Sequence, residues 1–505
     1  MKRNELGIIK IINLYRIAFA QNSPLYKYSL NKKYSILDES KFLESPWKGN
    51  IEEGQRIISN GLVSDETHKI NRYYILSFSW LIDLQAIGWH KSRKLAREFI
   101  KDFILEYRSK KFFWKNKTSW DLQTVSDRLI NWMFSYTFFA SGSKDKFQRL
   151  VLSSMAEQYH HLLKSYKAEL DYYKKLIILR TIFIYSCSLK KISKRKINSI
   201  LKDIKVSLIY LLEKNNQFEL SPYKFHNILK ILLEIRFMAQ SQRINIDNSY
   251  FKILQKLAST VRFFRHVDGG LSKHLIQKDE RIDKQLIDST LSILDSQINQ
   301  GFQHGFDKLV TKNVSLIINT IPRQCRSCLN RYNEPGLNVF DFDASVRNIM
   351  LINRADIACL IDKNMAKINK HARISFNQTS FYDYIKFVGE VQYNASVFNI
   401  AMRRDINVST DNKIYGTDFV RVNTESQTYC RFALNQKSEL HRINQNKVAI
   451  VVENNSYMFT ATSDSDFLLA IDDQNETPLP TINFIVNSKS NQETVINWIF
   501  EEKVA

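Results

Sequence analysis

The stretch Arg262-Phe263-Phe264-Arg265-His266-Val267-Asp268-Gly269-Gly270-Leu271 lies where the character of the chain changes. Before it, apolar residues recur with helical spacing, and beyond Pro322 they increasingly alternate as in strands. The two adjacent glycines allow a sharp turn, because glycine reaches positive φ without a steric penalty. Such a turn can present the charged side chains at the mouth of a cleft. The alternative is a helix C-terminus closed by glycine, where the helix dipole favours Arg265 and His266.

Helical periodicity dominates from about residue 72 to residue 300. One apolar face is formed by Val125, Leu129, Trp132 and Met133, with Asp127, Arg128 and Asn131 on the other side. Further helices are expected at about 77–107, 147–167, 170–188, 194–213, 223–240, 248–264 and 283–298. Repeated antiparallel helices without coiled-coil heptads predict an α/α toroid or solenoid. Residues 20–70 are irregular, and we expect Trp47 to anchor this arm on the first helices.

Short strands follow. The segments Lys447–Glu453 and Ser456–Thr462 flank a predicted hairpin turn at Asn454-Asn455, and further strands are expected at Phe467–Ile471, Thr481–Val486 and Thr494–Phe500. This spacing predicts an antiparallel β-sandwich. Helices and strands in separate blocks indicate an α+β chain of several domains. We expect an N-terminal arm at residues 1–70, an α/α toroid at 71–305 and a β-sandwich at 306–505.

The composition points to an anionic partner. The 505 residues include 73 Lys and Arg against 51 Asp and Glu, a formal charge of +22. Such an excess favours nucleic acid, an acidic polysaccharide or an anionic membrane surface, and charge alone does not choose among them. The basic run from Lys190 to Lys205 has no interleaved aromatic residues and no nucleic-acid motif. We interpret it as a solvated helix face.

Cysteine usage and hydropathy set further bounds. Five cysteines are too few and too scattered for a disulfide framework, and the lone Cys325-Arg-Ser-Cys328 is interpreted as incidental. No run of eighteen apolar residues predicts a transmembrane helix. Near the N-terminus, Lys10, Asn13 and Arg16 interrupt what would be the apolar centre of a signal peptide. We expect an amphipathic helix there, and periplasm, cell envelope and cytoplasm all stay open.

Several motifs occur in a recognisable order. They are Ser45-Pro-Trp-Lys-Gly49, Trp120 to Trp132 with Arg128, Asn216-Gln-Phe-Glu-Leu-Ser-Pro222, Arg262 to Gly270, His371-Ala-Arg-Ile-Ser-Phe376, Arg431-Phe432 and Ile496-Asn-Trp498. Over nearly the whole chain this order resembles the heparinase II/III-like polysaccharide lyases, a bacterial family. The resemblance implies an α/α toroid followed by an antiparallel β-sandwich, in agreement with the change of period. It also implies an acidic polysaccharide as partner, while nucleic acid is not favoured.

The reaction implied by the resemblance is β-elimination on a uronic-acid-containing polysaccharide. The C5 proton becomes acidic only when the neighbouring carboxylate is neutralised, and a side chain must then accept this proton. On this resemblance Gln217 and Arg265 would neutralise the uronate, and His266 or His371 would move the proton. Tyr223 or His226 is a further candidate acid or base. The remaining expected substrate-binding residues are Arg262, Asp268, Glu219 and Arg128.

The chain also departs from the family pattern. The neighbourhood of Glu169 to Lys175 has no Asn-His pair, and Tyr223-Lys-Phe-His226 is out of register with the family's tyrosine-histidine. Many members bind a structural metal such as zinc, but His371 alone remains of that ligand motif, so we expect no cofactor. The alternative is a catalytically inactive carbohydrate-binding or cell-envelope protein of the same fold. Ser221 and Pro222 have a separate structural interpretation, as an N-cap followed by proline at the first helical position.

Overall fold

The computed structural model describes residues 37–62, 72–107, 117–191, 193–212, 220–272, 283–294, 305–320, 323–325, 336–338, 342–347, 349–360, 372–380, 384–394, 399–472 and 479–503. The chain forms two compact units. The helical unit is the described part of Met1–Gln217, His226–Ala258 and Gln285–Ile298. The sheet unit is the described part of Phe218–Phe225, Ser259–Lys284 and Asn299–Ala505. The domain boundaries expected at residues 70 and 305 stay predictions.

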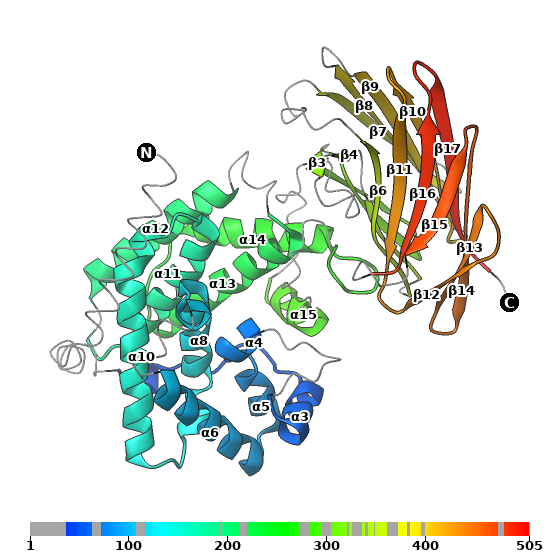
Figure 1. Ribbon diagram of the computed structural model, residues 1–505. Coiled ribbons are helices and arrows are strands. Elements are labelled where there is room, and N and C mark those ends of the chain that lie inside the picture. Colours follow the sequence, from blue (N-terminus) through cyan, green and yellow to red (C-terminus); the bar gives the residue numbers. More distant parts are fainter. Residues whose placement is uncertain are drawn as a thin grey trace. The chain divides into compact units, whose positions relative to one another are not determined.

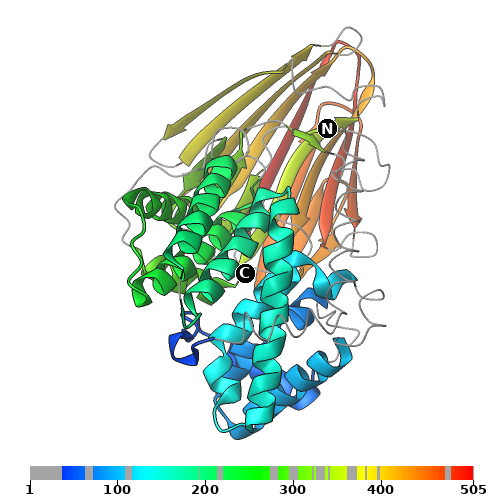
Figure 2. The ribbon, with the colours of Figure 1, turned by 90° about the vertical axis from the view of Figure 1, so that its left-hand side faces the viewer.

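Most helices form where the periodicity predicts them (Figure 1). Two expectations are wrong: Ile51–Asn60 is a helix within the segment 20–70 that was expected to be irregular, and the helix expected at 77–107 is interrupted at Gly88, which has φ +72°. They are α3 (Ile51–Asn60), α4 (Arg72–Leu76), α5 (Leu81–Ile87), α6 (His90–Tyr107), α8 (Leu122–Phe134), α9 (Tyr136–Ala140), α10 (Asp145–Ser165), α11 (Tyr172–Cys187), α12 (Lys194–Leu212), α13 (Pro222–Ser241), α14 (Asn248–Phe263) and α15 (Lys284–Ser292). The helical part is an incomplete α/α toroid, as expected. Its helices are seen from a second side in Figure 2.

Helix α11 is the inner helix of the helical unit. Asp171 begins it as the N-cap, where its carboxylate accepts hydrogen bonds from the backbone N–H groups of Tyr173 and Lys174. Every residue from Leu176 to Cys187 is buried, as expected for a helix that is apolar on all sides. Helices α8, α10 and α12 pack against it. The strongly apolar sequence of α11 therefore places it in the core.

The arm before α3 is anchored differently from the prediction. The indole Nε1 of Trp47 donates to Oε1 of Glu234 on α13 at 2.7 Å, and its ring packs against Phe237. A buried indole N–H needs an acceptor, and α13 supplies it. The expectation that Trp47 docks on the first helices is therefore wrong. The next turn does meet α5, where Asp83 accepts from the backbone N–H of Asn50 at 2.7 Å.

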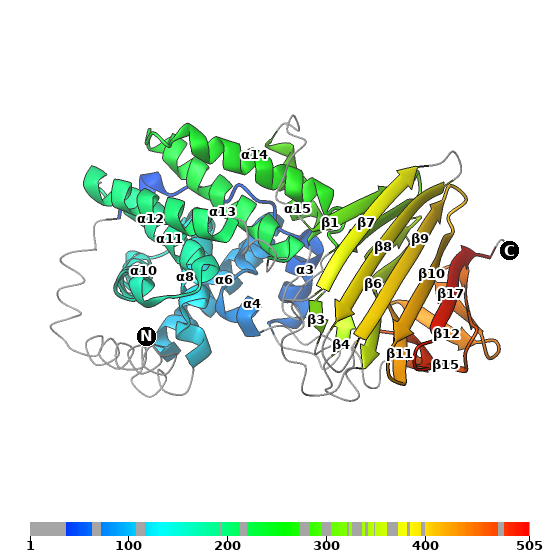
Figure 3. The ribbon, with the colours of Figure 1, turned by 90° about the horizontal axis from the view of Figure 1, so that it is seen from above.

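The sheet unit contains two antiparallel sheets. The strands are β1 (Phe306–Val310), β2 (Val314–Asn319), β3 (Arg323–Cys325), β4 (Gly336–Asn338), β5 (Phe342–Val346), β6 (Met350–Leu360), β7 (Ala372–Ser380), β8 (Tyr384–Asn394), β9 (Asn399–Ser409), β10 (Ile414–Val422), β11 (Ser426–Leu434), β12 (Ser438–Arg442), β13 (Lys447–Val452), β14 (Asn455–Ser463), β15 (Phe467–Asp472), β16 (Thr481–Ser488) and β17 (Glu493–Glu502). One sheet has the order β1-β2-β5-β6-β11-β16-β15, and β4 also pairs with β6 and carries β3 at its other edge. The other has the order β12-β13-β14-β17-β10-β9-β8-β7, and Figure 3 shows β7 to β10 side by side.

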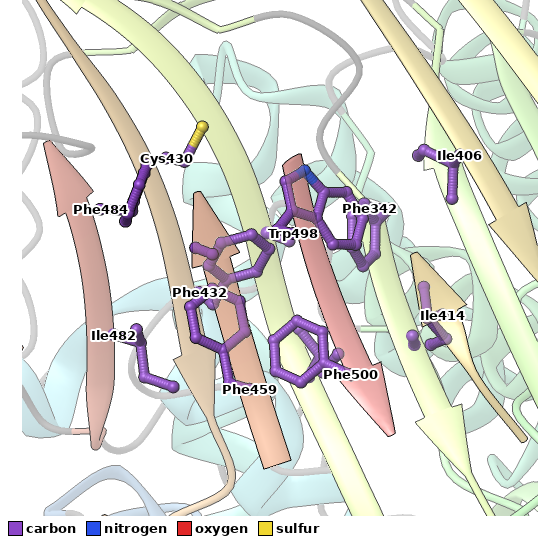
Figure 4. Packing of buried hydrophobic residues seen from close by; sticks show 14 of the residues in the cluster. Phe342, Ile406, Ile414, Cys430, Phe432, Phe459, Ile482, Phe484, Trp498 and Phe500 are labelled. Carbon is purple, nitrogen blue, oxygen red and sulfur yellow. The ribbon is translucent and has the colours of Figure 1, made fainter. Parts of the chain in front are cut away.

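The two sheets enclose one apolar core, as predicted for a sandwich. Inward residues alternate with outward ones along β17 and β10, because successive side chains of a strand point to opposite faces. Aromatic rings fill the middle of the core, where Phe432, Phe459, Trp498 and Phe500 contact one another (Figure 4). Gly416 lies opposite Trp498, and a Cβ there would come within 2.1 Å of the indole ring. The glycine therefore makes room for the tryptophan.

One predicted turn is displaced by a residue. Asn455 already pairs with Val452, so the hairpin between β13 and β14 turns at Glu453 and Asn454 rather than at Asn454-Asn455. Glu453 takes the positive φ of the turn, at 57°. This register points Val448, Ile450 and Val452 into the core, and a shift by one residue would turn them outward.

Candidate functional site

The stretch Arg262–Leu271 forms a tight turn in the sheet unit. Helix α14 ends at Phe263, and the chain then folds back so that Arg265 bridges Leu271. The backbone N–H of His266 donates to the carbonyl of Gly270 at 2.8 Å, and that of Gly269 donates to the carbonyl of His266 at 3.0 Å. Gly269 has φ +81°, which confirms the predicted positive-φ turn. The alternative of a helix end closed by these glycines is wrong, since the helix ends well before them.

The turn places His266 on the sheet. The imidazole is buried, with Nδ1 lying 3.3 Å from the hydroxyl of Ser315 on β2. Its Nε2 lies 3.6 Å from a carboxylate oxygen of Asp343 on the neighbouring strand β5. A carboxylate near an imidazole nitrogen holds the orientation of the ring. We call His266, Ser315, Asp343 and Ser345 the His266 cluster.

The His266 cluster rests on a polar face of strands β2 and β5. Ser315 pairs with Ser345, and Ile317 pairs with Asp343, so these side chains share one face of the sheet. The opposite face carries Leu316 and Ala344, which belong to the apolar core. Ser345 is buried, and its hydroxyl has no hydrogen-bond partner among the described residues. A buried polar face of this kind needs a functional or structural reason, because unpaired buried polar groups cost free energy.

Lysine 308 lies next to this face. Its ammonium group donates to the backbone carbonyl of Arg265 at 2.7 Å, so β1 and the turn are held together. Burial lowers the pKa of Lys308 to about 8, because a charged ammonium group is poorly solvated there. Lys308 therefore exchanges a proton much nearer to neutral pH than an ordinary lysine. A side chain with such a pKa is suited to acid–base chemistry.

Two of the predicted charged residues hold the turn itself. Arg265 Nε donates to the carbonyl of Gly269 at 3.1 Å, and its guanidinium covers this glycine. The carboxylate of Asp268 accepts from the backbone N–H of Gly270 at 3.0 Å and from Nζ of Lys284 at 2.7 Å. Arg262 is half-buried in the last turn of α14. Arg265 and Asp268 therefore stabilise the turn, and their expected role in substrate binding stays a prediction.

The glutamate-x-serine-proline segment also meets the turn. Pro222 opens α13, and the hydroxyl of Ser221 accepts from the backbone N–H of Lys224 at 3.2 Å, which confirms the predicted N-cap. Phe225 stacks on Phe264 with ring centroids 6.1 Å apart. This contact brings the segment that carries Tyr223 close to the segment that carries His266. Tyr223 is half-buried.

Histidine 226 is not part of this group. It belongs to the helical unit, where its Nε2 lies 3.0 Å from the hydroxyl of Thr290 on α15. Burial lowers the pKa of His226 to about 3, and nearby Lys230 adds to the effect. The imidazole is therefore neutral and packed between helices. We assign it to the core of the helical unit rather than to catalysis.

Arginine 128 is likewise a core residue. Its side chain is fully buried, although the periodicity of α8 places it away from the apolar face. Nε donates to Gln158 at 2.8 Å, and NH1 donates to the carbonyls of Leu76 and Ser119, both at 3.0 Å. The guanidinium thus joins three segments of the helical unit. We correct the expected substrate-binding role of Arg128 on this ground.

Three predicted site residues lie outside the described residues, namely Gln217, Glu219 and His371. Their roles stay predictions. The strands contribute residues that the motifs did not identify: Lys308, Ser315 and Asp343. Part of their signal was alternation, because Phe342–Val346 places polar residues at every second position. In Val314–Asn319 the polar residues Ser315 and Asn319 lie on one strand face, with Ile317 between them. This pattern predicts a polar sheet face, but it does not say what covers that face.

A second polar cluster lies in the helical unit. Arg180 on α11 donates to Glu234 on α13 at 3.1 Å and also to Asp127 on α8. Asp127 accepts from the hydroxyl of Tyr73 as well, and Glu234 also accepts from Trp47. Burial opposes the charge of Arg180, but the two carboxylates outweigh it and raise the pKa. The signal in the sequence was an arginine within the apolar run of α11.

Two searches of the described residues complete the description of the site. No group of three histidine, cysteine, aspartate or glutamate side chains there is arranged to hold a metal ion. No helix in the described ranges combines the length and apolar character that crossing a bilayer requires. The first result includes the His266 cluster, which offers one imidazole and one carboxylate.

Comparison with known proteins identifies the fold. No protein-family model matches the chain, and no curated protein matches it in sequence. A solved heparinase III structure matches with a TM-score of 0.56 and 12% identity, over 92% of this chain and 83% of that one. The chain has a fold similar to that of heparinase III. A heparan sulfate lyase from Pedobacter heparinus (TM-score 0.47, 12% identity, 90% of this chain and 83% of that one) and a chondroitinase AC lyase (0.48, 9%, 98% and 83%) are also found.

Proposed function

We propose that this protein is a polysaccharide lyase-like protein that binds uronic-acid-containing polysaccharide and cleaves it by β-elimination. The observation that carries the proposal is the fold similarity to heparinase III over 92% of the chain. The formal charge of +22 supports an anionic substrate. The turn Arg262–Leu271, which carries the most specific motif of the family resemblance, gathers an imidazole, a guanidinium and a lysine of lowered pKa.

The proposed chemistry follows from what β-elimination needs. Cationic or amide donors must neutralise the uronate before its C5 proton can leave, and we assign this role to Arg265 and Gln217. A base must accept the proton, and we assign this role to His371 or His266. Lys308 is an additional candidate, because its pKa of about 8 leaves an appreciable neutral fraction near physiological pH. Tyr223 is the candidate that protonates the leaving glycosidic oxygen.

The test is a panel of uronate-containing polymers. The full chain is incubated with heparan sulfate, chondroitin sulfate, hyaluronan and alginate, and the absorbance of the unsaturated product is followed. We expect product from at least one polymer, with a rate that increases as pH rises through about 8 if Lys308 is the base. Lys308→Arg, which stays protonated, should then abolish that rise. Binding without product from any polymer would remove the cleavage step from the proposal.

The second candidate function is a carbohydrate-binding protein of the same fold without catalysis. The burial of His266, with Asp343 and Ser315 at its two ring nitrogens, favours this candidate, because substrate must reach a catalytic base. It expects His266→Ala and His371→Ala to leave polysaccharide affinity almost unchanged. Isothermal titration with the polymer that binds best measures this affinity. A large loss in either variant would count against the candidate.

A further inference from the structure

Helix α12 exposes a basic face. Its buried side is formed by Ile197, Ile200, Ile204 and Leu208, which pack into the helical unit. Its other side presents the exposed residues Lys194, Arg195, Lys202 and Lys205. From Lys194 to Lys205 this face is about 16 Å long at the helical rise of 1.5 Å per residue. Lys190 and Lys191 precede it in the chain and extend the basic character.

Most of these charges form no ion pair within the described part of the chain. Among the described residues, no ion pair involves Lys194, Arg195 or Lys202. Lys205 pairs with Asp247 at 3.1 Å, but both side chains are exposed, and such a pair contributes little. An uncompensated row of cations creates a positive potential that attracts polyanions. The face is therefore more than a solvated surface balanced by local pairs.

An aromatic pair stands at the C-terminal end of this face. The rings of Tyr172 on α11 and Tyr210 on α12 stack with centroids 3.9 Å apart, and the ammonium group of Lys175 lies 5.6 Å from the Tyr172 ring. Tyr210 is 48% exposed, and Val206 and Ile209 beside it are exposed as well. Aromatic rings at a surface provide flat apolar area that a sugar ring can cover. The structure thus places a stacking platform at the end of a row of cations.

We propose that α12 and the Tyr172–Tyr210 pair form a second binding surface for acidic polysaccharide, separate from the turn Arg262–Leu271. Lys194, Arg195, Lys202 and Lys205 contact the carboxylate or sulfate groups of the chain, and Tyr210 packs against a sugar ring. The surface retains a long polymer while another part of it is bound elsewhere, which raises the effective concentration of the polymer. The inference rests on the proposed function for its choice of polyanion.

The buried side of α12 argues against a membrane as the partner. A helix that lies in a bilayer surface needs a free apolar face. In α12 that face is already covered by the helical unit, and only the short patch Val206, Ile209 and Tyr210 remains outside. A polysaccharide needs no such face, because spaced cations and one aromatic platform are sufficient. Duplex DNA would use the same cations but gains nothing from a stacking tyrosine at one end.

The experiment compares two triple variants of the full chain. Lys194→Gln, Lys202→Gln and Lys205→Gln together remove three of the four cations of the proposed surface. The matched control is Lys91→Gln, Lys94→Gln and Lys101→Gln, which removes the same charge from exposed positions on α6. The probe is whichever of heparan sulfate, chondroitin sulfate, hyaluronan and alginate the wild type binds best as a long polymer. We expect the α12 triple to bind about tenfold more weakly, and the control to change less than about twofold.

A second pair of variants tests the aromatic platform. Tyr210→Ser should weaken binding, while Tyr210→Phe should keep the affinity, because phenylalanine retains the ring. Equal affinities for wild type and the α12 triple, or equal losses in both triples, would overturn the inference. A selective loss of binding to duplex DNA or to phosphatidylserine vesicles, with polysaccharide affinity unchanged, would also overturn it and identify the other partner.

The outcomes separate this inference from the proposed function. Cleavage of a short oligosaccharide should be unchanged in the α12 triple, because the proposed role of the α12 surface is to retain a long polymer. A wild type that binds the long polymer without cleaving it, and loses that affinity in the α12 triple, would remove the lyase activity and support the surface. A wild type that binds none of the polymers would overturn both.

Discussion

The sheet unit contains two buried polar groups that are organised in opposite ways. In the sandwich core, Arg404 donates twice to Asp418, at 2.6 and 2.9 Å, and both side chains are fully buried. The same carboxylate accepts from Trp498 Nε1 at 2.9 Å. In the His266 cluster the contacts are longer, 3.3 Å to Ser315 and 3.6 Å to Asp343. The first group is closed by short hydrogen bonds, whereas the second has unused hydrogen-bonding capacity.

This difference distinguishes buried polar groups that stabilise the fold from buried polar groups that can still bind a ligand. A buried ion pair with its hydrogen bonds satisfied fixes one arrangement of the strands, and Arg404 and Asp418 face each other across β9 and β10. Unused capacity, as at His266 Nε2 and the hydroxyl of Ser345, can be filled by a ligand, a proton or water. We therefore expect the closed group to dominate stability and the His266 cluster to dominate function.

The largest loss of stability should come from breaking the ion pair between Arg404 and Asp418. Asp418→Ala leaves the guanidinium of Arg404 buried without its partner, and we expect a loss of about 3–5 kcal/mol in the free energy of unfolding. Urea unfolding followed by tryptophan fluorescence measures it. The double variant Arg404→Met with Asp418→Leu should recover most of the loss, because no charge then stays buried. A loss below about 1 kcal/mol for Asp418→Ala would mean that water reaches the pair.

The second effect is on the pH dependence of the unfolding free energy, and it comes from His226, which is buried in the helical unit. Burial lowers the pKa of His226 to about 3, against an ordinary value of about 6.5. Between these values only the unfolded chain binds the proton, so this stabilising contribution is full above pH 6.5 and decreases as pH falls. It should decrease by about 1.4 kcal/mol per pH unit. His226→Gln should flatten the pH dependence of the unfolding free energy by this slope.

His161 provides the internal control for that measurement. Burial lowers its pKa to about 4, so it also destabilises the protein in acid, but equally in both proteins. The difference between wild type and His226→Gln therefore isolates His226. Parallel curves for the two proteins from pH 7 to pH 4 would show that His226 is protonated in the folded chain.

A smaller loss of stability is expected when the conformation of the turn that carries His266 is disturbed. Gly269→Ala places a side chain at φ +81° and a Cβ 3.2 Å from the guanidinium of Arg265. We expect a loss of about 1–3 kcal/mol from the backbone conformation and from displacement of Arg265. Gly142→Ala is the matched control, with φ +67° and nothing within 4 Å of its Cβ. Equal thermal unfolding of the two variants would show that Arg265 moves without cost.

The smallest change in stability should fall at His266 itself. His266→Gln removes a side chain with only long polar contacts, so we expect less than about 1 kcal/mol in the free energy of unfolding. If the proposed function holds, product formation on the best polymer should fall at least tenfold in the same variant. A large destabilisation would instead show that His266, like Arg404 and Asp418, serves mainly to stabilise the fold. Urea unfolding and the absorbance assay give the two values.

Local patterns predicted much of the architecture. The period of 3.6 residues located α8, α10, α11, α12, α13 and α14, and alternation located β13, β14, β16 and β17, whereas α3 was missed. These patterns succeed because burial on one face is decided by neighbours in the sequence. Ser221 with Pro222 predicted the start of α13 for the same reason. The boundary of the β13–β14 hairpin was missed by one residue, since the register depends on the partner strand.

The candidate site was predicted only in part. The glycine pair located the turn that carries Arg265 and His266, and the structure brings it together with Phe225 beside Tyr223. Arg128 and His226 looked equally available, but both are buried in the helical unit. A polar residue at a helical position can face solvent, a ligand or a buried acceptor such as Gln158. The sequence pattern is the same in all three cases.

By itself, the sequence determined the helical and strand blocks, the excess of positive charge and the sharp turn at Gly269, because each depends on composition or on adjacent residues. Only the tertiary structure decided what His266 meets, since Ser315 and Asp343 come from strands far along the chain. It also decided that Tyr210 stacks on Tyr172 beside the exposed cations of α12. Contacts between distant segments depend on how the whole core packs, and no local pattern encodes them.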